Sequence, residues 1–249
     1  MTGAPLPDRG PAGDQGHRAA ALVVAIDGPS GTGKSTIAKR VAQREGLAYL
    51  DTGAMYRAVT WWCLQQGIDL ADTDAVAEAA RTMPLRVGTD PREPTFAVGD
   101  HDVTAEIRTS RISTQVSAVA TNLAVRAHLQ ERQRQEIAAE TTPGGRSQGR
   151  GIVAEGRDIT TVVAPDAQVR ILLVADEQVR LARRSAELHG RADARALAAT
   201  RDQVLRRDAQ DGTVSNFTTA ADGVITVDTS MMDVDQAVAA VVELVEAAR

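Results

Sequence analysis

The chain has 249 residues, 43% of them hydrophobic, with a net charge of −5 and no apolar run near the roughly 18 residues that a membrane-spanning helix needs. The negative charge argues against a protein that holds nucleic acid by bulk electrostatics, and a single cysteine, Cys63, excludes an intrachain disulfide and favours a cytoplasmic protein. Residues 1–20 are Gly, Pro and polar side chains with no apolar signal segment, and we expect a disordered tail there.

The rest of the chain, residues 21–249, is expected to form a single domain in which short apolar runs alternate with helical patterns. The apolar runs predict five buried strands near residues 21–26, 47–50, 151–154, 169–174 and 223–227. Strands that alternate with helices are typical of a parallel sheet. The sequence therefore predicts an α/β fold, with a doubly wound five-stranded parallel sheet and helices on both of its faces.

Two segments depart from this alternation. The first is an insert at about residues 53–140, where period-two alternation on both sides of a turn at residues 89–94 predicts a small antiparallel hairpin. Helical spacing follows from residue 113 to residue 140, with an interruption near Thr121 and Asn122.

The second departure is an arginine-rich helical segment at about residues 176–215. Arg180, Arg183 and Arg184 are spaced so that they share one face of a helix. Such a row of cations repels itself on an ordinary surface but suits a lid that closes over a polyphosphate. A solvated, charged helix face remains the alternative, because Glu177 and Glu187 lie nearby.

The first predicted strand runs directly into a glycine-rich segment. Gly28 and the triplet Gly33-Lys34-Ser35 fit the phosphate-loop pattern G-x-x-x-x-G-K-[ST] between a strand and a helix. Backbone N–H groups of such a loop converge on phosphate oxygens, and the start of the helix adds a positive end. Lys34 can reach the outer phosphates, and the Ser35 hydroxyl can coordinate Mg²⁺. We expect the ATP-binding residues to be Gly28, Pro29, Ser30, Gly31, Thr32, Gly33, Lys34, Ser35 and Thr36.

Polar clusters follow three of the predicted strands, at Asp27, at Asp51-Thr52 and at residues 155–158. The carboxyl ends of parallel strands meet at one edge of a sheet, where ligands bind in this class of fold. We therefore expect the three clusters to border one crevice.

The distribution of lysine and arginine narrows the class of phosphate-loop protein. A GTPase carries a guanine-reading N-K-x-D segment, and the two lysines of the chain, Lys34 and Lys39, lie outside any such segment. A kinase that acts on a nucleotide needs further cations outside the loop, because two anionic groups must approach each other. The lid arginines and a cluster around Arg206, Arg207 and Asp208 are candidates.

Four segments of the chain, residues 26–36, 50–57, 102–109 and 155–167, resemble bacterial cytidylate (CMP/dCMP) kinases. The D-V-x-x-E-I-R-T and G-R-D-x-x-T-V-V motifs are the specific ones, since many kinases share the phosphate loop. The resemblance extends from about Leu22 to the C-terminus. It implies transfer of the γ-phosphoryl group of ATP to CMP or dCMP, by a monomeric enzyme with no nucleic-acid or membrane partner.

The resemblance also implies an acceptor pocket. Its residues would be Thr52, Tyr56, Arg57, Arg108, Ser117, Arg126, Arg157, Asp158, Arg207 and Asp211. In this family pattern Arg57, Arg126 and Arg207 contact the acceptor phosphate and Asp211 the ribose, while Ser117, Arg157 and Asp158 read the cytosine edge with Tyr56 beside it. The cytosine amino group donates to a carboxylate such as Asp158, which repels the carbonyl of uracil. Charge on the transferring group would be stabilised by Lys34, Arg180, Arg183, Arg184 and Arg207.

The chain departs from the family pattern at Val214, where relatives carry an arginine; Arg206 or a lid arginine is expected to substitute. Two alternatives stay open at this stage. One is a phosphate-loop kinase of another small acceptor, and the other is a nucleotide-gated protein that binds ATP without transferring phosphate.

Overall fold

The computed structural model describes residues 20–189 and 194–249. Apart from Ala20, the predicted tail lies outside the described residues, and so do residues 190–193 of the predicted lid. Among the helices that are described, none combines the length and the apolar composition needed to cross a membrane.

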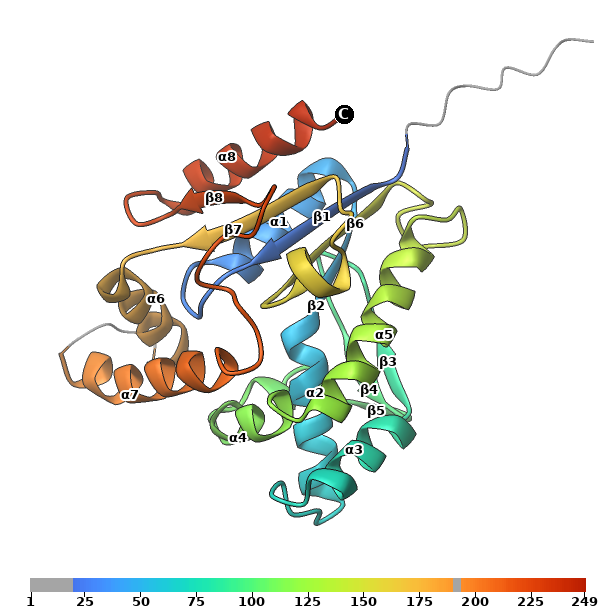
Figure 1. Cartoon of the computed structure of the whole chain (residues 1–249), viewed down its shortest axis with the longest axis vertical. Helices are drawn as coiled ribbons and strands as arrows, with labels where there is room; N and C mark the ends of the chain where they lie inside the picture. The colour runs from blue at the N-terminus through green and yellow to red at the C-terminus, as the bar shows by residue number, and fades with distance from the viewer. Residues whose placement is uncertain (1–19, 190–193) are drawn as a thin grey trace, which may run out of the picture.

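A parallel sheet of five strands forms the centre of the molecule (Figure 1). Its strands are β1 (Leu22–Asp27), β2 (Ala48–Asp51), β6 (Gly151–Gly156), β7 (Val169–Val174) and β8 (Ile225–Asp228). They lie in the order β2-β6-β1-β7-β8, so that β1 pairs in parallel with both β6 and β7. Helices cover both faces of the sheet, and the central strands are mostly apolar and buried. This arrangement confirms the predicted fold class.

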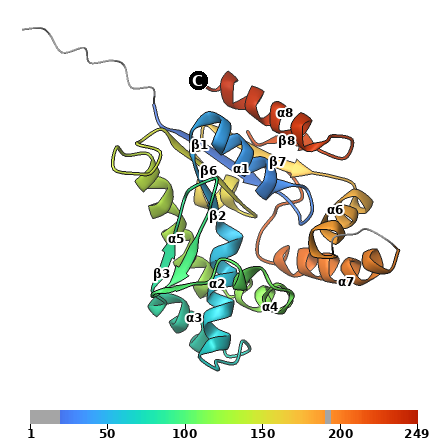
Figure 2. The same cartoon turned by 180° about the vertical axis from the view of Figure 1, so that it is seen from behind.

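Two helices, α1 (Lys34–Glu45) and α8 (Val234–Ala247), cover one face of the sheet; Figure 2 shows α1 in front of it. Ile37 and Val41 of α1 and Val241 of α8 belong to the same buried cluster as Val24 and Ile171 of the sheet. Since aromatic residues are only 2% of the chain, this core consists almost wholly of aliphatic side chains.

Helices of the predicted insert cover the opposite face. The elements between β2 and β6 are α2 (Thr52–Gln65), α3 (Thr73–Thr82), β3 (Leu85–Val87), β4 (Phe96–Val98), β5 (His101–Asp102), η1 (Glu106–Arg108), α4 (Ser110–Ala120) and α5 (Leu123–Glu140). The predicted hairpin is confirmed, with Leu85 opposite Val98, and β5 adds a third antiparallel strand. The predicted interruption separates α4 from α5, because the side chain of Asn122 accepts hydrogen bonds from the first N–H groups of α5.

Two features follow the central strands at their carboxyl ends. After β6, residues Ile159–Val163 (η2) form a single π turn, and the buried Asp27 carboxylate accepts hydrogen bonds from Ile159 N, Thr160 N and Thr160 Oγ1 at 2.7–3.0 Å. After β7, α6 (Glu177–His189) and α7 (Ala194–Asp211) form what we call the α6–α7 arm, which lies beyond the end of the strand (Figure 1). The arm and η2 therefore lie beside the same edge of the sheet.

Candidate active site

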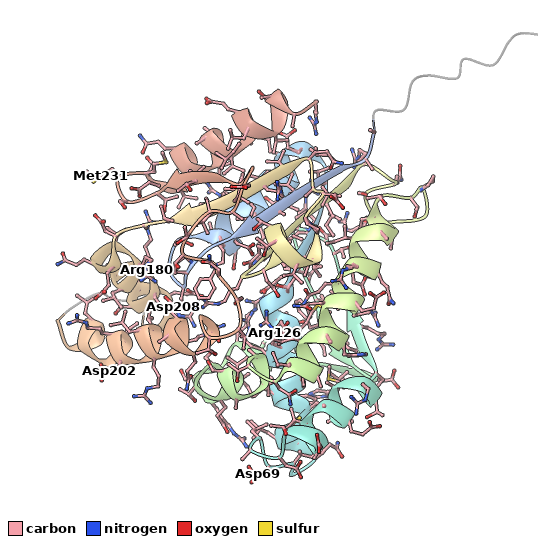
Figure 3. All side chains as sticks on the ribbon, viewed as in Figure 1. Asp69, Arg126, Arg180, Asp202, Asp208 and Met231 are labelled. Carbon is pink, nitrogen blue, oxygen red and sulfur yellow. The ribbon has the colours of Figure 1, made fainter. Side chains whose placement is uncertain are left out.

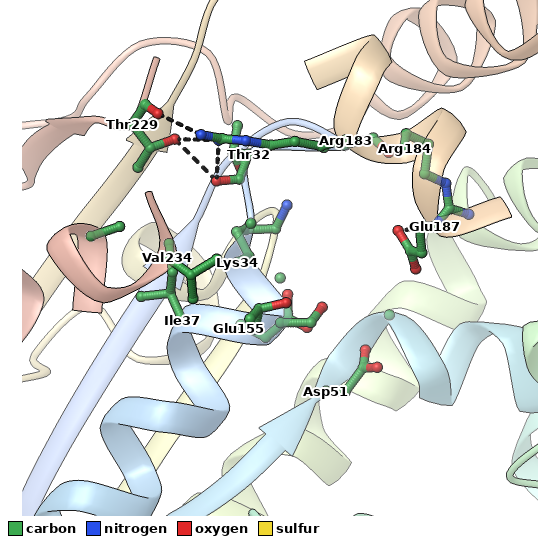
Figure 4. Close-up of a pocket in the computed structure, with 18 of the residues that line it drawn as sticks. Thr32, Lys34, Ile37, Asp51, Glu155, Arg183, Arg184, Glu187, Thr229 and Val234 are labelled. Atoms are coloured by element: carbon green, nitrogen blue, oxygen red, sulfur yellow. Dashed lines mark hydrogen bonds and ion pairs between the residues drawn. The ribbon is translucent and has the colours of Figure 1, made fainter. Parts of the chain in front are cut away.

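A cavity of about 660 Å³ lies at the carboxyl ends of β1, β2 and β6. Residues 30–37 border it on one side and Asp51, Glu155 and Arg157 on another, so two of the predicted clusters meet the phosphate loop there. Asp27, from the third cluster, is buried under η2 and does not line the cavity. The α6–α7 arm and the start of α8 complete its walls (Figure 4).

The phosphate loop, residues 28–35, has the open backbone that anion binding requires. Gly28, Gly31 and Gly33 all have positive φ angles, which side chains disfavour. A Cβ atom on Gly31 would lie only 2.4 Å from the carbonyl oxygen of Arg180, so the loop packs directly against the backbone of the α6–α7 arm. No side chain caps α1, and its first N–H groups therefore face the cavity as donors for an anion.

Lys34 is half-buried at the floor of the cavity, where its Nζ donates to the carbonyl oxygen of Pro29 at 2.8 Å. Burial lowers the pKa of Lys34 to about 8, although Glu155 acts in the opposite direction. A cation that is desolvated in this way gains more from a polyanion than an exposed one does. Figure 4 shows its side chain extending into the space between the arm and the sheet.

Oxygen ligands for a divalent cation gather beside Lys34. The Ser35 hydroxyl donates to Glu155 Oε1 at 2.6 Å. Asp51 of β2 lies opposite Glu155 of β6 in the sheet, so the two carboxylates are neighbours. Burial, reinforced by the Asp51 charge, raises the pKa of Glu155. No cluster of three or more His, Cys, Asp or Glu side chains occurs in the described part of the chain, so these groups suit Mg²⁺ only if phosphate oxygens and water complete its shell.

The opposite wall of the cavity is cationic. Arg57 and Arg108 both pair with Asp51, at 3.0 and 3.2 Å, and although burial acts to raise the pKa of Asp51, these arginines hold it below its usual value. Arg207 Nε is buried without a hydrogen bond, and its ion pair with Asp211 is long, at 3.7 Å. Burial, together with the nearby charges of Arg157 and Arg57, lowers the pKa of Arg207 to about 10. This concentration of positive charge favours an anionic ligand.

Of the residues expected to read the base, Tyr56, Ser117 and Asp158 lie outside the cavity lining, whereas Arg157 is part of it. Asp158 accepts from Arg126 at 2.5 Å and from Gln130 at 2.6 Å, and all three side chains sit between α5 and the end of β6. The hydroxyl of Tyr56 and both amide atoms of Gln133 are buried there without hydrogen-bond partners. Buried polar atoms of this kind are uncommon and mark a place where a polar ligand is missing or a network rearranges.

Three further expected residues connect the base side to the cavity. Arg157 donates to Asp211 at 2.9 Å, and its guanidinium lies 4.2 Å over the ring of Phe217. Ser117 Oγ lies 3.4 Å from Asp211 Oδ1, and Thr52 Oγ1 donates to the carbonyl oxygen of Glu155 at 2.8 Å. Ser117, Arg157 and Arg207 thus gather around the Asp211 carboxylate, while Arg126 and Asp158 form a separate pair.

The three arginines of α6 have different surroundings. Arg183 donates to Thr229 Oγ1, to the carbonyl oxygens of Thr229 and Met232, and at 3.5 Å to that of Thr32 (Figure 4). Arg184 lines the cavity and pairs with Glu187, whereas Arg180 lies outside the lining. Val214 is also outside the lining and Arg206 is exposed, so Arg184 is the better-placed substitute for the arginine of the family pattern.

Sequence reasoning missed several residues of the site. Thr229, Asp233 and Val234 line the end of the cavity next to α8, and Thr229 follows β8 as a polar residue at a strand end, the signal that identified Asp51. No sequence signal distinguished Gln130 from other polar residues on α5. Tyr49, whose hydroxyl donates to Glu155 Oε1 at 3.2 Å, is hidden within an apolar strand pattern.

Comparisons with known proteins agree with this geometry. The sequence model of the family described as Cytidylate kinase matches residues 24–247. The chain is 46% identical to the cytidylate kinase of Streptomyces avermitilis, over 92% of this chain and 94% of that protein. It is 47% identical to the cytidylate kinase of Streptomyces coelicolor, over 93% and 95% of the two chains. It is 48% identical to the cytidylate kinase of Cutibacterium acnes, over 90% of this chain and 96% of that protein.

Proposed function

The chain belongs to the cytidylate kinase family, and we propose that it transfers the γ-phosphoryl group of ATP to CMP or dCMP, giving ADP and CDP or dCDP. One observation carries the proposal: an open phosphate loop and a group of arginines line one cavity, at the carboxyl ends of the central strands. A site of this kind holds two anionic groups against their mutual repulsion.

On the donor side, the N–H groups at the start of α1 and Lys34 bind the β- and γ-phosphates. The cavity continues past Thr229 to Val234, and we assign this end to the donor nucleoside. Ser35, with Glu155 and Asp51 beside it, would hold Mg²⁺, which would neutralise charge on the phosphate oxygens.

On the acceptor side, Arg57 and Arg207 bind the phosphate of CMP, with Asp211 at the ribose. Arg126, which the family pattern also places at this phosphate, is paired with Asp158 outside the cavity lining, so we assign its place to Arg108, which lines the cavity. Asp158 accepts a hydrogen bond from the amino group of cytosine, supported by Arg126 and Gln130. The partnerless hydroxyl of Tyr56 lies beside this group and supplies a further polar contact. Because uracil carries a carbonyl in place of that amino group, the carboxylate selects against UMP.

The transfer is direct and in line, and it requires positioning more than acid–base chemistry. The acceptor phosphate is already ionised, so no general base is needed. Arg184 and Arg207, both from the α6–α7 arm, line the cavity, and we assign them to stabilising charge on the transferring group. Movement of the α6–α7 arm over the cavity excludes water, which would otherwise hydrolyse ATP.

A coupled assay of ADP formation with each nucleoside monophosphate tests the substrate. We expect CMP and dCMP to exceed UMP and AMP in kcat/KM by about a hundredfold or more, because the wrong base leaves Asp158 without its donor. Equal rates with all acceptors would refute the cytosine assignment in favour of a broader kinase. Binding of ATP without any transfer would instead identify a nucleotide-gated binding protein.

The lowered pKa of Lys34 predicts how donor capture depends on pH. The free protein loses the Lys34 charge as the pH rises through about 8, so kcat/KM for ATP falls over this range. Bound triphosphate stabilises the ammonium form, so kcat stays constant to higher pH. Initial rates over a pH series, with ATP varied at saturating CMP, check this. A kcat/KM that stays level well above pH 8 would contradict it.

A further inference from the structure

Asp208 connects three parts of the active site that come from distant points of the chain. Its Oδ1 accepts a hydrogen bond from Ser30 N at 3.2 Å and lies 2.9 Å from an Nη atom of Arg157. Its Oδ2 accepts from Arg180 Nη1 at 2.6 Å. Ser30 belongs to the phosphate loop, Arg157 follows β6 on the acceptor side, and Arg180 lies on α6. Figure 3 labels Arg180 on α6 and its partner Asp208 on α7.

These ion pairs are sheltered from water. The side chains of Asp208, Arg157 and Arg180 are 13%, 15% and 12% exposed. Burial acts to raise the pKa of Asp208, but Arg157 and Arg180 reverse this and hold it below its usual value. Pairs this well shielded fix geometry more strongly than exposed surface pairs do.

The loop and the arm are joined at a single residue of the phosphate loop. Ser30 gives its N–H to Asp208, and its carbonyl oxygen accepts from Arg180 at 3.0 Å. Arg180 and Asp208 bond to each other, which closes a ring of three residues. The adjacent Gly31 packs against the Arg180 backbone, so the start of α6 lies directly on the loop.

The acceptor side is joined to the same carboxylate through Arg157. This guanidinium also binds Asp211 and lies over Phe217, so its position is fixed from two further sides. Asp208 itself does not line the cavity, in contrast to Arg207 beside it. Its partners are therefore protein groups, and its effect on ligands acts through them.

We propose that Asp208 is a positioning residue that couples donor binding to acceptor binding by holding the phosphate loop, Arg157 and the α6–α7 arm in one network. The inference rests on the proposed function, since it takes CMP as the acceptor. When ATP fixes the phosphate loop, the contacts of Asp208 also fix Arg157 on the acceptor side. When CMP fixes Arg157, the same contacts fix the loop. Each ligand then raises the affinity of the other by the same factor.

The test measures the affinity of a non-hydrolysable ATP analogue, with imido nitrogen between its β- and γ-phosphates, in the absence and presence of saturating CMP. Titration calorimetry gives both affinities. We expect CMP to raise the analogue affinity of the wild-type protein at least about fivefold. In Asp208→Asn, which keeps the shape but cannot neutralise two guanidinium groups, the factor falls to about one, while each ligand alone binds within about threefold of wild type.

Two variants control for folding and for charge. Asp202→Asn changes an exposed carboxylate on the same helix. In this variant CMP should raise the affinity for the ATP analogue as much as in the wild-type protein. Asp208→Glu restores the charge and recovers part of the coupling, which loss of folding would not allow. Thermal unfolding of all variants is followed in parallel.

The possible outcomes separate the two proposals. A wild-type protein that neither binds nor phosphorylates CMP overturns the proposed function, and the coupling with it. If the wild-type protein phosphorylates CMP but CMP does not change its affinity for the ATP analogue, only the coupling role is overturned. The coupling role of Asp208 is also overturned if CMP raises the analogue affinity of Asp208→Asn as much as that of the wild-type protein.

Discussion

Replacing Lys34 with methionine lowers kcat/KM for phosphoryl transfer by about a thousandfold or more. The change removes the one ammonium group on the floor of the cavity, and single cations that stabilise a transferring phosphoryl group contribute effects of this size in related chemistry. Because Lys34 is partly desolvated and its pKa is lowered, its charge costs folding free energy, and we expect the melting temperature to stay level or rise. Steady-state kinetics and thermal unfolding check the two parts.

The chain offers a matched control in its only other lysine. Lys39 lies on the same helix, with its Nζ 5.7 Å from the centre of the Tyr49 ring and outside the cavity lining. Lys39→Met therefore retains activity within about threefold of wild type. Full activity in Lys34→Met would remove the phosphate loop from the mechanism.

Replacing Asp158 with asparagine reduces the preference for CMP over UMP by about a hundredfold. The carboxylate only accepts hydrogen bonds, whereas an asparagine amide also donates and can satisfy the carbonyl of uracil. The ratio of kcat/KM for the two acceptors measures the effect. It separates base recognition from general damage, because a misfolded variant loses both activities together.

Asp158→Asn also weakens an internal ion pair, so its thermal unfolding must be measured beside its kinetics. Loss of the charge facing Arg126 lowers the melting temperature by several degrees. The control is Asp69→Asn, because Asp69 is an exposed carboxylate in the turn between α2 and α3. This change should alter neither the CMP preference nor the melting temperature. An unchanged CMP preference in folded Asp158→Asn would exclude this residue from base recognition.

Much of the fold follows from local sequence patterns. The phosphate loop, the five apolar strands and the hairpin each carry a signal that involves only near neighbours, and all of them are present. The strand β5 escaped prediction because two residues, His101 and Asp102, show no alternation to detect. The π turn after Asp158 escaped because its hydrogen bonds go to Asp27, more than a hundred residues away in sequence.

Residues of the candidate site could be predicted where a polar side chain directly follows a strand. They were harder to predict where a residue's role depends on its contacts with distant segments. Asp51 and Glu155 border the cavity, as their positions after strands implied. The spacing of Arg180, Arg183 and Arg184 indicated a shared face, but it could not reveal that Arg183 binds the carbonyl oxygens after β8 while Arg180 binds Asp208. Such partners arise only when distant segments pack together.

The ion pair between Arg126 and Asp158 has a consequence for the Asp158 carboxylate. Arg126 and Gln130 both donate to its Oδ2, so two neighbours on α5 have already set the orientation of this carboxylate. In the proposed role of Asp158, the acceptor for the cytosine amino group is therefore preorganised, and little side-chain entropy is lost when the nucleotide binds. A carboxylate held in this way also cannot rotate away from the carbonyl of a wrong base.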